Sequence, residues 1–320
     1  RKDDQDMAGI VVKGLGYAHG RRSVSNEDMA RTVDTSDRWI REKTGIRSRY
    51  FAEDRTNTDM ACDAAEKAIA SAGISREEIR WLIVCTFTPD DRTPSTACAA
   101  AGSLGLRQDV LALDINGACS GFIYGCELAG GLLHSRDGKG YALVIGSEKI
   151  SPRMDMKDRS TCVLFGDGAG AAVLAWDESA VFRFRGGCVP DRDVLYCDQK
   201  QGLIHMNGQE VYRFAVSRVP AEIRALMEEN SLSEEDVDWY VLHQANERII
   251  DSAVRRLGKP EKKFFKNLYH YGNTSAASIP IALSEMEEKG LLRGRKRILA
   301  VGFGAGLTYG SMYIEVDIEV

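Results

Sequence analysis

The sequence predicts an α/β fold built from two similar halves. Short apolar runs alternate with helical patterns along its 320 residues, which is typical of α/β proteins. Residues 72–86 match residues 230–244 at a constant offset, and both copies open with a capping box and end in an apolar strand. The identical pairs are Ser75 with Ser233, Glu77 with Glu235, and Trp81 with Trp239. We therefore predict an internal duplication, with one half over residues 7–176 and the other over residues 177–320.

A second likeness supports the duplication. The run FGDGAG at residues 165–170 resembles FGAG at residues 303–306, and each leads into the last strand of its half. The glycines of the first run do not predict a phosphate site, because GK[ST] and GxGxxG are missing and a strand follows. We interpret this run as a tight structural turn.

The elements of the first half are predicted in chain order. Apolar spacing indicates a helix over 58–72 and buried strands over 81–86, 110–115 and 141–146. After a turn at 116–118, a helix begins at Cys119 and carries an inward face at spacings of three and four. That face consists of Phe122, Ile123, Cys126, Ala129, Leu132 and Leu133.

In the second half, strands over 239–242 and 264–268 are each expected to end in polar residues. The second strand leads into a turn at 271–278 that opens another helix. No pattern assigns the stretch 182–202.

Composition excludes several classes of protein. With 44% hydrophobic residues and a net charge of −5, the chain can bury a large core and lacks the basic surface of a nucleic-acid-binding protein. No run approaches 18 apolar residues, so no membrane span is expected. The eight cysteines include no CxxC pair, which favours a reduced, cytoplasmic protein without a metal site.

Cys119 is the first candidate for chemistry. It follows a predicted strand and begins a helix, where free backbone N–H groups and the helix dipole stabilise a thiolate. Small neighbours (Gly117, Ala118, Ser120 and Gly121) leave the sulfur open to a substrate. On this stretch alone, a buried structural cysteine is an equally good interpretation.

His243 and Asn273 are the partners predicted for Cys119. His243 ends the strand at 239–242, and Asn273 lies in the turn that corresponds to the Cys119 turn in the other half. Ligands of α/β sheets bind at the carboxyl ends of strands, so the three side chains are expected to meet there. A single His or Asn is more often structural, but the repeat ties these positions together and favours catalysis.

The motifs that hold these residues resemble one family. NGACSGF, HQAN, YGNTSAAS and FGAGLTYG, together with VDTSDRWI, KTGI and DRST followed by FGDGAGAAVLA, are similar to the β-ketoacyl-acyl-carrier-protein synthase III family of the thiolase superfamily. The resemblance covers nearly the whole chain from Met7. It implies an internally duplicated thiolase-like fold with five layers, αβαβα. It also implies decarboxylative condensation of an acyl-CoA with malonyl-acyl carrier protein, initiating fatty acid synthesis, by a cytoplasmic homodimer without a cofactor.

The resemblance also assigns roles. Cys119 would carry the acyl group, and His243 and Asn273 would bind the thioester carbonyl of the malonyl group. The oxyanion would be bound by the backbone of Cys119 and of the 304–306 turn, at Ala305 and Gly306. The CoA and pantetheine tunnel would be lined by Trp39, Lys43 (commonly Arg in the family), Arg159, Tyr212, Asn246 and Arg248.

Two further sites are implied by the resemblance. An acidic carrier protein would dock on Arg213, Arg248, Arg255 and Arg256. Thr93 would lie in the loop that reaches across the dimer to close the partner's acyl pocket, where its small side chain would admit primers longer than acetyl. Two alternatives stay open: a starter synthase or acyltransferase of a secondary-metabolite pathway with the same fold, and a non-catalytic acyl-binding scaffold.

Overall fold

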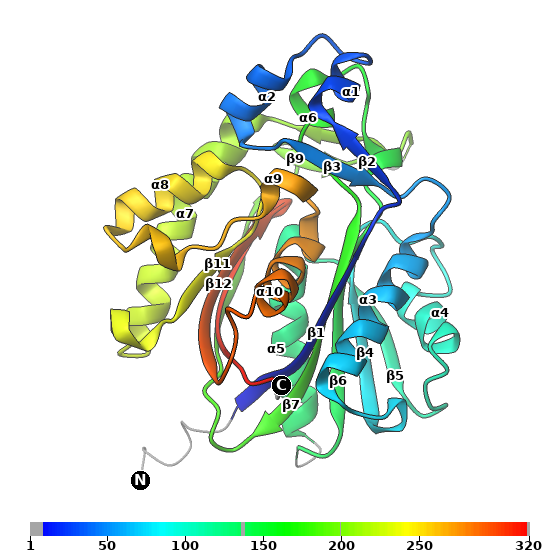
Figure 1. The fold of residues 1–320 in the computed structure, drawn as a ribbon, viewed down its shortest axis with the longest axis vertical. Coiled ribbons are helices and arrows are strands. Elements are labelled where there is room, and N and C mark those ends of the chain that lie inside the picture. Colours follow the sequence, from blue (N-terminus) through cyan, green and yellow to red (C-terminus); the bar gives the residue numbers. More distant parts are fainter. Residues whose placement is uncertain (1–8, 136–137, 199, 319–320) are drawn as a thin grey trace.

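The computed structural model describes residues 9–135, 138–198 and 200–318, which form a large mixed sheet with helices on both sides (Figure 1). The strands follow one another in the order β11-β12-β13-β1-β7-β6-β4-β5, and β8 pairs with β13 outside this path. The main elements of the first half are β1 (Gly9–His19), α3 (Asn57–Ala72), β4 (Ile79–Cys85), α4 (Thr96–Ser103), β5 (Leu111–Ile115), α5 (Gly121–His134), β6 (Tyr141–Glu148) and β7 (Gly168–Asp177).

The second half repeats this order of elements, with an isolated bridge between Tyr240 and Phe264 in the place of β5. Its elements are β8 (Arg183–Asp191), α7 (Gly208–Glu229), β11 (Trp239–Leu242), α8 (Glu247–Leu257), α10 (Ser278–Glu288), β12 (Lys296–Gly304) and β13 (Gly306–Val316). The pairings match as well: β4 is parallel to β6 as β11 is to β12, while β7 is antiparallel to β1 and β6 as β13 is to β8 and β12. The two sets of strands join where β1 runs parallel to β13.

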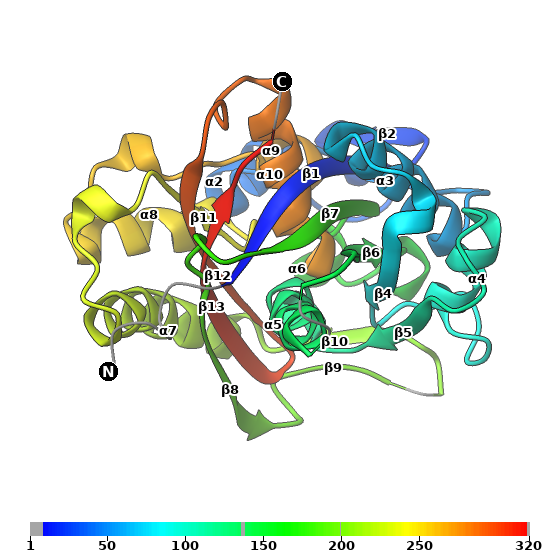
Figure 2. The same cartoon turned by 90° about the horizontal axis from the view of Figure 1, so that it is seen from below.

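The core is divided among three layers of helices: one layer lies between the strands of the two halves, and one lies on each outer side. Along β4, Ile83 packs into the central core with α5, whereas Leu82 and Val84 pack under α3. Along β12, Ile298 joins the central core and Leu299 packs under α7. Because successive side chains of a strand point to opposite faces, these contacts define five layers, αβαβα. Figure 2 shows α7 and α8 on one outer side, α3 and α4 on the other, and α5 and α10 between.

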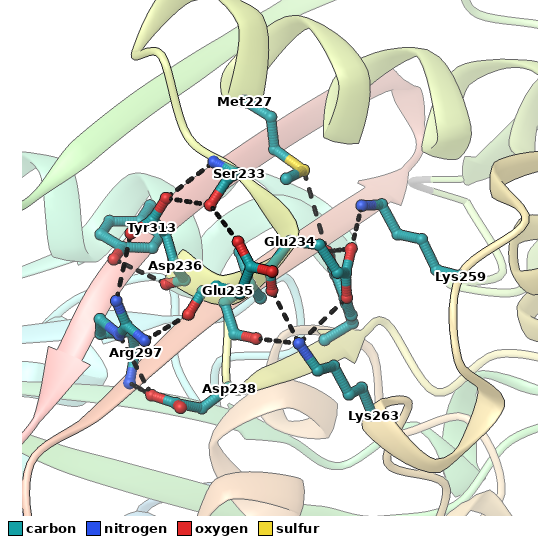
Figure 3. Close-up of polar contacts among 12 residues, drawn as sticks. Met227, Ser233, Glu234, Glu235, Asp236, Asp238, Lys259, Lys263, Arg297 and Tyr313 are labelled. Carbon is teal, nitrogen blue, oxygen red and sulfur yellow. Dashed lines mark hydrogen bonds and ion pairs between the residues drawn. The ribbon is translucent and has the colours of Figure 1, made fainter.

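The repeated segments of the sequence occupy equivalent places. Each begins with a capping box on a 3₁₀ turn, Ser75 at η1 (Arg76–Glu78) and Ser233 at η4 (Glu234–Asp236), and each leads into a strand. Ion pairs fasten the second copy to its surroundings: Glu234 binds Lys259 and Lys263, and Arg297 binds Asp236 and Asp238 (Figure 3).

The likeness between FGDGAG and FGAG does not mark equivalent positions. Phe303 and Gly304 belong to β12, whereas Phe165 precedes β7 and forms only an isolated bridge with Asn273. The register of the sheet instead pairs Gly146 with Gly170 in one half and Gly302 with Gly310 in the other. The topology therefore shows the duplication, but this second motif does not.

Two strand predictions need correction. The strand at 110–115 is not buried: β5 lies at an edge of the sheet, and Leu111 is 51% exposed. Its apolar side chains suggested a core position because the sequence does not show which strand is last in the order. The expected strand over 264–268 is a single bridge between Phe264 and Tyr240, followed by the short helix α9 (Leu268–Tyr271).

Smaller elements complete the fold. The stretch 182–202, unassigned from the sequence, contains β8 and then β9 (Leu195–Cys197), which forms a hairpin with β10 (Ile204–Met206). The others are β2 (Arg22–Ser25), α1 (Asn26–Ala30), α2 (Asp37–Thr44), β3 (Ser48–Phe51), α6 (Arg159–Cys162) and the 3₁₀ turns η2 (Ala118–Ser120), η3 (Ser151–Arg153), η5 (Glu261–Lys263) and η6 (Ser275–Ala277). None of the helices in the described ranges is long and apolar enough to cross a membrane.

Candidate active site

A pocket of about 1440 Å³ opens at the carboxyl ends of the strands and brings the predicted trio together. Cys119, His243 and Asn273 all line it. Cys119 comes from the turn before α5, His243 from the end of β11, and Asn273 from the turn before α10. Residues 154 positions apart in the chain therefore meet because the two halves place their strand ends side by side.

Cys119 sits in the 3₁₀ turn η2, immediately before α5 begins at Gly121. The turn is held by the Asn116 side chain, whose Oδ1 accepts the N–H of Ala118 at 3.2 Å, and Ala118 has a φ of 47°. Burial raises the pKa of the Cys119 thiol to about 12, although a hydrogen bond from Ser275 opposes this rise. The expected thiolate is therefore not supported: desolvation outweighs the helix terminus and keeps the pKa of Cys119 above neutral pH.

His243 is a buried, neutral imidazole. Burial lowers its pKa to about 3, and its ring packs edge-on against Phe303 at 5.2 Å. Its Nδ1 lies 2.7 Å from the hydroxyl of Ser278, and that hydroxyl also accepts the N–H of Gln244. Among the described residues no other acceptor takes the Ser278 proton, and donating it to Nδ1 uses the hydroxyl as both acceptor and donor. The proton of the neutral ring is then on Nε2, which makes His243 a hydrogen-bond donor.

Asn273 is held on both sides of its backbone by the loop that contains the FGDGAG run. Its N–H donates to the carbonyl of Leu164, and its carbonyl accepts the N–H of Gly166. Its side-chain Oδ1 accepts the N–H of Ser275 at 2.8 Å. This contact orients the amide so that its NH₂ is the group left to donate to a ligand.

The backbone opposite Cys119 is formed by the end of β12. A Cβ placed on Gly304 would lie 2.7 Å from the Cys119 nitrogen, so only glycine allows this approach. Gly304 and Ala305 line the pocket, whereas Gly306 begins β13 and pairs with Asp191. The structure thus places Ala305, but not Gly306, in the pocket wall together with Cys119.

Comparison with known proteins identifies the family. Residues 113–187 match the sequence profile of 3-oxoacyl-[acyl-carrier-protein] synthase III, and residues 227–316 match the profile of its C-terminal part. The chain is 41% identical over 324 residues to β-ketoacyl-[acyl-carrier-protein] synthase III of Clostridium acetobutylicum, covering 97% of this chain and 99% of that protein. The chain belongs to the β-ketoacyl-[acyl-carrier-protein] synthase III family. It is therefore a condensing acyltransferase of the thiolase fold.

Solved structures of the synthase III family agree with the fold. The crystal structure of the synthase III from Aquifex aeolicus superposes with a TM-score of 0.91 at 40% identity, covering 95% of this chain and 99% of that one. A priming β-ketosynthase from the R1128 polyketide biosynthetic pathway also superposes with a TM-score of 0.91, at 33% identity and 98% coverage of both chains. The same fold and a similar degree of identity thus occur outside fatty acid synthesis.

Most residues predicted for the CoA tunnel of a synthase III line the pocket. They are Trp39, Lys43, Tyr212, Asn246 and Arg248. The guanidinium of Arg248 lies 5.6 Å from the Tyr212 ring, and Asn246 caps α8 and donates to the carbonyl of Lys43. Arg159 is not part of the wall itself, but its guanidinium stacks 4.9 Å from the Trp39 ring.

The predicted docking residues differ in their availability. Arg248, Arg255 and Arg256 are exposed on α8, and within the described residues none of them takes part in an ion pair. Arg213 is exposed on α7 but is paired with Glu210 at 2.7 Å. Thr93 is exposed and lies outside the pocket of its own chain, so its predicted role in a partner's pocket stays a prediction.

Sequence reasoning missed several residues around the trio. Ser275 and Ser278 lie within the quoted run YGNTSAAS, but a hydroxyl in a turn has no spacing that reveals its partner. Glu148 is completely buried at the end of β6 and accepts hydrogen bonds from Thr86, the Phe87 N–H, Thr88 and Ser275. The sequence did offer one signal for Glu148: a charged residue stands directly at the end of the apolar strand β6. The β9–β10 hairpin also lines the pocket, through Leu195, Tyr196, Cys197 and Ile204.

No metal site was predicted. In the ranges that the structure describes, no group of three His, Cys, Asp or Glu side chains is arranged to hold a metal ion. All eight cysteines are free thiols.

Proposed function

We propose that this synthase III transfers an acyl group from acyl-CoA to Cys119 and then condenses it with malonyl-acyl carrier protein. The product is a β-ketoacyl-acyl carrier protein, and the step initiates fatty acid synthesis. The observation that carries the proposal is that a nucleophilic thiol, a neutral imidazole and an orienting amide converge in one pocket. A pocket of about 1440 Å³ is large enough for a ligand of the size of CoA.

In the first half-reaction, the Cys119 sulfur attacks the thioester carbonyl and CoA leaves. The N–H groups of Cys119 and Ala305 stabilise the tetrahedral oxyanion, and Gly304 leaves the space between them open. The aromatic face of Trp39 and the guanidinium of Arg248 offer an adenine and a phosphate their usual partners.

In the second half-reaction, malonyl-acyl carrier protein occupies the same pocket. The Nε2–H of His243 and the amide of Asn273 donate to its thioester carbonyl, and they stabilise the enolate that forms as CO₂ departs. A neutral imidazole suits this role, because the pKa of about 3 keeps His243 uncharged at physiological pH. The carbanion then attacks the acyl-Cys119.

Intact-mass measurement tests this proposal. The wild-type protein, mixed with a panel of acyl-CoAs, is expected to gain one acyl group on Cys119, and Cys119→Ser is expected to gain none. Addition of malonyl-acyl carrier protein should then discharge the acyl group and release CO₂. Failure of every acyl-CoA in the panel to load Cys119 would reject the proposal.

A second candidate is favoured by the likeness to the priming β-ketosynthase of a polyketide pathway. A starter synthase would carry out the same chemistry with another primer or another acceptor. The panel of acyl-CoAs separates the two functions. Turnover of malonyl-acyl carrier protein with acetyl or short branched primers supports fatty acid synthesis. Transfer to a different acceptor, with no turnover of malonyl-acyl carrier protein, supports the starter synthase. A non-catalytic scaffold would leave Cys119 unreactive toward iodoacetamide.

The quaternary state belongs to the same proposal. The edge strand β5 exposes Leu111, and α5 exposes Leu128, which favours a homodimer that covers this edge. Sedimentation of the wild type should give a dimer, and Leu111→Lys should shift it toward the monomer. In that dimer Thr93 would reach the partner's pocket and admit primers longer than acetyl. The eight free cysteines fit a cytoplasmic enzyme, and the proposed chemistry needs no cofactor.

A further inference from the structure

Glu148 is a buried carboxylate that the proposed mechanism does not use. It is 0% exposed, and five hydrogen bonds reach its two oxygens from three hydroxyls and one backbone N–H. All these groups donate and so favour the ionised carboxylate, whereas burial opposes ionisation and raises the pKa of Glu148 overall. No arginine or lysine among the described residues pairs with it: the neighbouring Lys149 turns away and binds the carbonyls of Glu53 and Arg55.

Ser275 connects this carboxylate to the nucleophile. Its hydroxyl donates to Glu148 Oε1 at 3.1 Å, and Ser275 lines the pocket together with Cys119 on the adjoining turn, where its hydroxyl lowers the pKa of the thiol. A hydroxyl has one proton to donate. While Ser275 donates that proton to Glu148, its oxygen can accept the S–H of Cys119. Once the proton has moved, the Ser275 hydroxyl donates to the thiolate, which is the contact that lowers the pKa of Cys119. The three groups therefore form a directed chain, from S–H to O–H to carboxylate.

We propose that Glu148 accepts the proton of Cys119 through the hydroxyl of Ser275, keeps it while Cys119 is acylated, and returns it after condensation. This inference rests on the proposed function, since it supplies the base that acyl transfer requires. Ser275 and Glu148 act on the thiol, and His243 is left to serve the malonyl group.

The proton and electron balance closes over the cycle. In acyl transfer the S–C bond to Cys119 forms, the proton moves to Glu148, and CoA leaves with the electron pair of its C–S bond and takes a proton from solvent. In condensation the enolate formed by loss of CO₂ displaces the Cys119 sulfur as a thiolate, which recovers the proton from Glu148. One solvent proton is consumed in each turnover, as the decarboxylative condensation requires.

The arrangement has an electrostatic advantage for the second half-reaction. With the proton on Glu148, no buried negative charge faces the enolate as it forms beside Cys119. Burial raises the pKa of Glu148 to about 8, which is in the range suited to a base at physiological pH. The titratable groups that the Glu148 charge affects are Cys85 on β4, Cys119 on η2 and Cys197 on β9, and all three have raised pKa values.

The test measures how fast Cys119 reacts with acyl-CoA and, separately, with iodoacetamide between pH 6 and 10. In the wild type both rates should fall as pH drops below about 8. Glu148→Gln should lose the break near pH 8, so that the rates rise with pH over the whole range as the thiol itself ionises. Both reactions should be about 100-fold slower near neutral pH, within the usual contribution of a general base. Ser275→Ala should cause a similar loss, and the double variant should be no slower than either single variant.

Asp167→Asn is the matched control. Asp167 is a second buried carboxylate of the same half with a raised pKa, held by Ser151 and three backbone N–H groups, and it does not line the pocket. The Asp167→Asn substitution should lower the melting temperature and leave the pH dependence of Cys119 reactivity unchanged.

Several results would overturn the relay. If the charge of Glu148 acts only by repelling the thiolate, Glu148→Gln should instead speed alkylation. An increase in rate, or a profile equal to that of Asp167→Asn, contradicts the proposal. If Glu148→Gln does not fold, two other results would contradict the proposal. One is a Ser275→Ala variant that reacts at the wild-type rate, and the other is a wild-type rate of Cys119 alkylation that does not change with pH. Alkylation by iodoacetamide needs no acyl-CoA and therefore tests the relay independently. Failure of the wild type to accept any acyl-CoA would reject the proposed function alone.

Discussion

The turn before α5 and the turn before α10 are two copies of one structure that carry different side chains. In each, an asparagine accepts the N–H two residues later (Asn116 with Ala118, Asn273 with Ser275), and that later residue has a φ of 47° or 51°. A 3₁₀ turn and a helix follow in both. The third position beyond the asparagine is Cys119 in one copy and Ala276 in the other.

The surroundings of the two turns differ in a complementary way. By sheet register, Glu148 at the end of β6 corresponds to Gly304 at the end of β12. Glu148 fills the space beside Ser275, whereas Gly304 leaves the space beside Cys119 open to the pocket. Duplication thus provides one scaffold twice. In the proposed mechanism, the turn with open space beside it carries the nucleophile Cys119, and the other turn carries Asn273 and Ser275, which bind the substrate and the carboxylate of Glu148.

A second pair of positions shows the same division. His243 occupies the place of Cys85 in the repeat. The helix after the asparagine turn begins with Ser278 (α10) in that half and with Gly121 (α5) in the other. Ser278 supports the His243 ring, whereas a Cβ on Gly121 would lie 3.2 Å from the Cys85 side chain. In the proposed mechanism, His243 and Ser278 serve the chemistry, whereas Cys85 and Gly121 allow close packing.

Filling the space beside Cys119 should have the largest effect. Gly304→Ala places a methyl group 2.7 Å from the Cys119 nitrogen, where it displaces an oxyanion donor. Acylation of Cys119 should slow by about 100- to 1,000-fold, measured by intact mass against time. The control is Gly102→Ala, whose added methyl has no neighbour within 4 Å and should leave the rate unchanged. A Gly304→Ala protein that acylates normally would show that the open space is not required.

Removing the support of His243 should have an intermediate effect. Ser278→Ala leaves Nδ1 of His243 and the N–H of Gln244 without their partner, which costs about 1–3 kcal/mol. CO₂ release from malonyl-acyl carrier protein should fall about 10- to 100-fold, while acylation changes little, and Ser278→Thr should restore the rate. Ser284→Ala, a buried serine of the same helix bonded to the Pro280 carbonyl, is the control. Equal losses in both half-reactions would contradict this division.

The smallest effect concerns the two outer helices at equivalent places. α8 exposes Arg248 and Arg255, whereas α4 consists mainly of small residues. Arg248→Glu and Arg255→Glu should each raise KM for malonyl-acyl carrier protein several-fold at low salt, with less effect at high salt. Acylation by acyl-CoA should be spared in Arg255→Glu. Arg293→Glu, an exposed arginine at the opposite end of β12, is the control, and a KM unchanged in all three variants would exclude docking on α8.

The sequence predicted the parts of this arrangement that depend on pattern. The 3.6-residue spacing located α3 and α5, and the repeat at Ser75 and Ser233 located equivalent strands in both halves. Strand order carries no such pattern, so β5 was expected in the core and is at an edge. Polar contacts between distant residues, such as Ser275 with Glu148, also could not be predicted, because no spacing in the sequence reveals the partner. The thiol of Cys119 was expected to be ionised because its helix terminus is visible in the sequence and its burial is not.

The most direct test of the division between the two copies is Asn273→Ala, assayed for both half-reactions in the same preparation. The variant keeps Cys119, its turn and the N–H of Ala305, and loses one donor to the enolate. We predict that acyl-CoA loads Cys119 at close to the wild-type rate, while CO₂ release from malonyl-acyl carrier protein falls about 100- to 1,000-fold. An Asn273→Ala protein that decarboxylates normally but no longer accepts an acyl group would reverse the two roles and contradict the account.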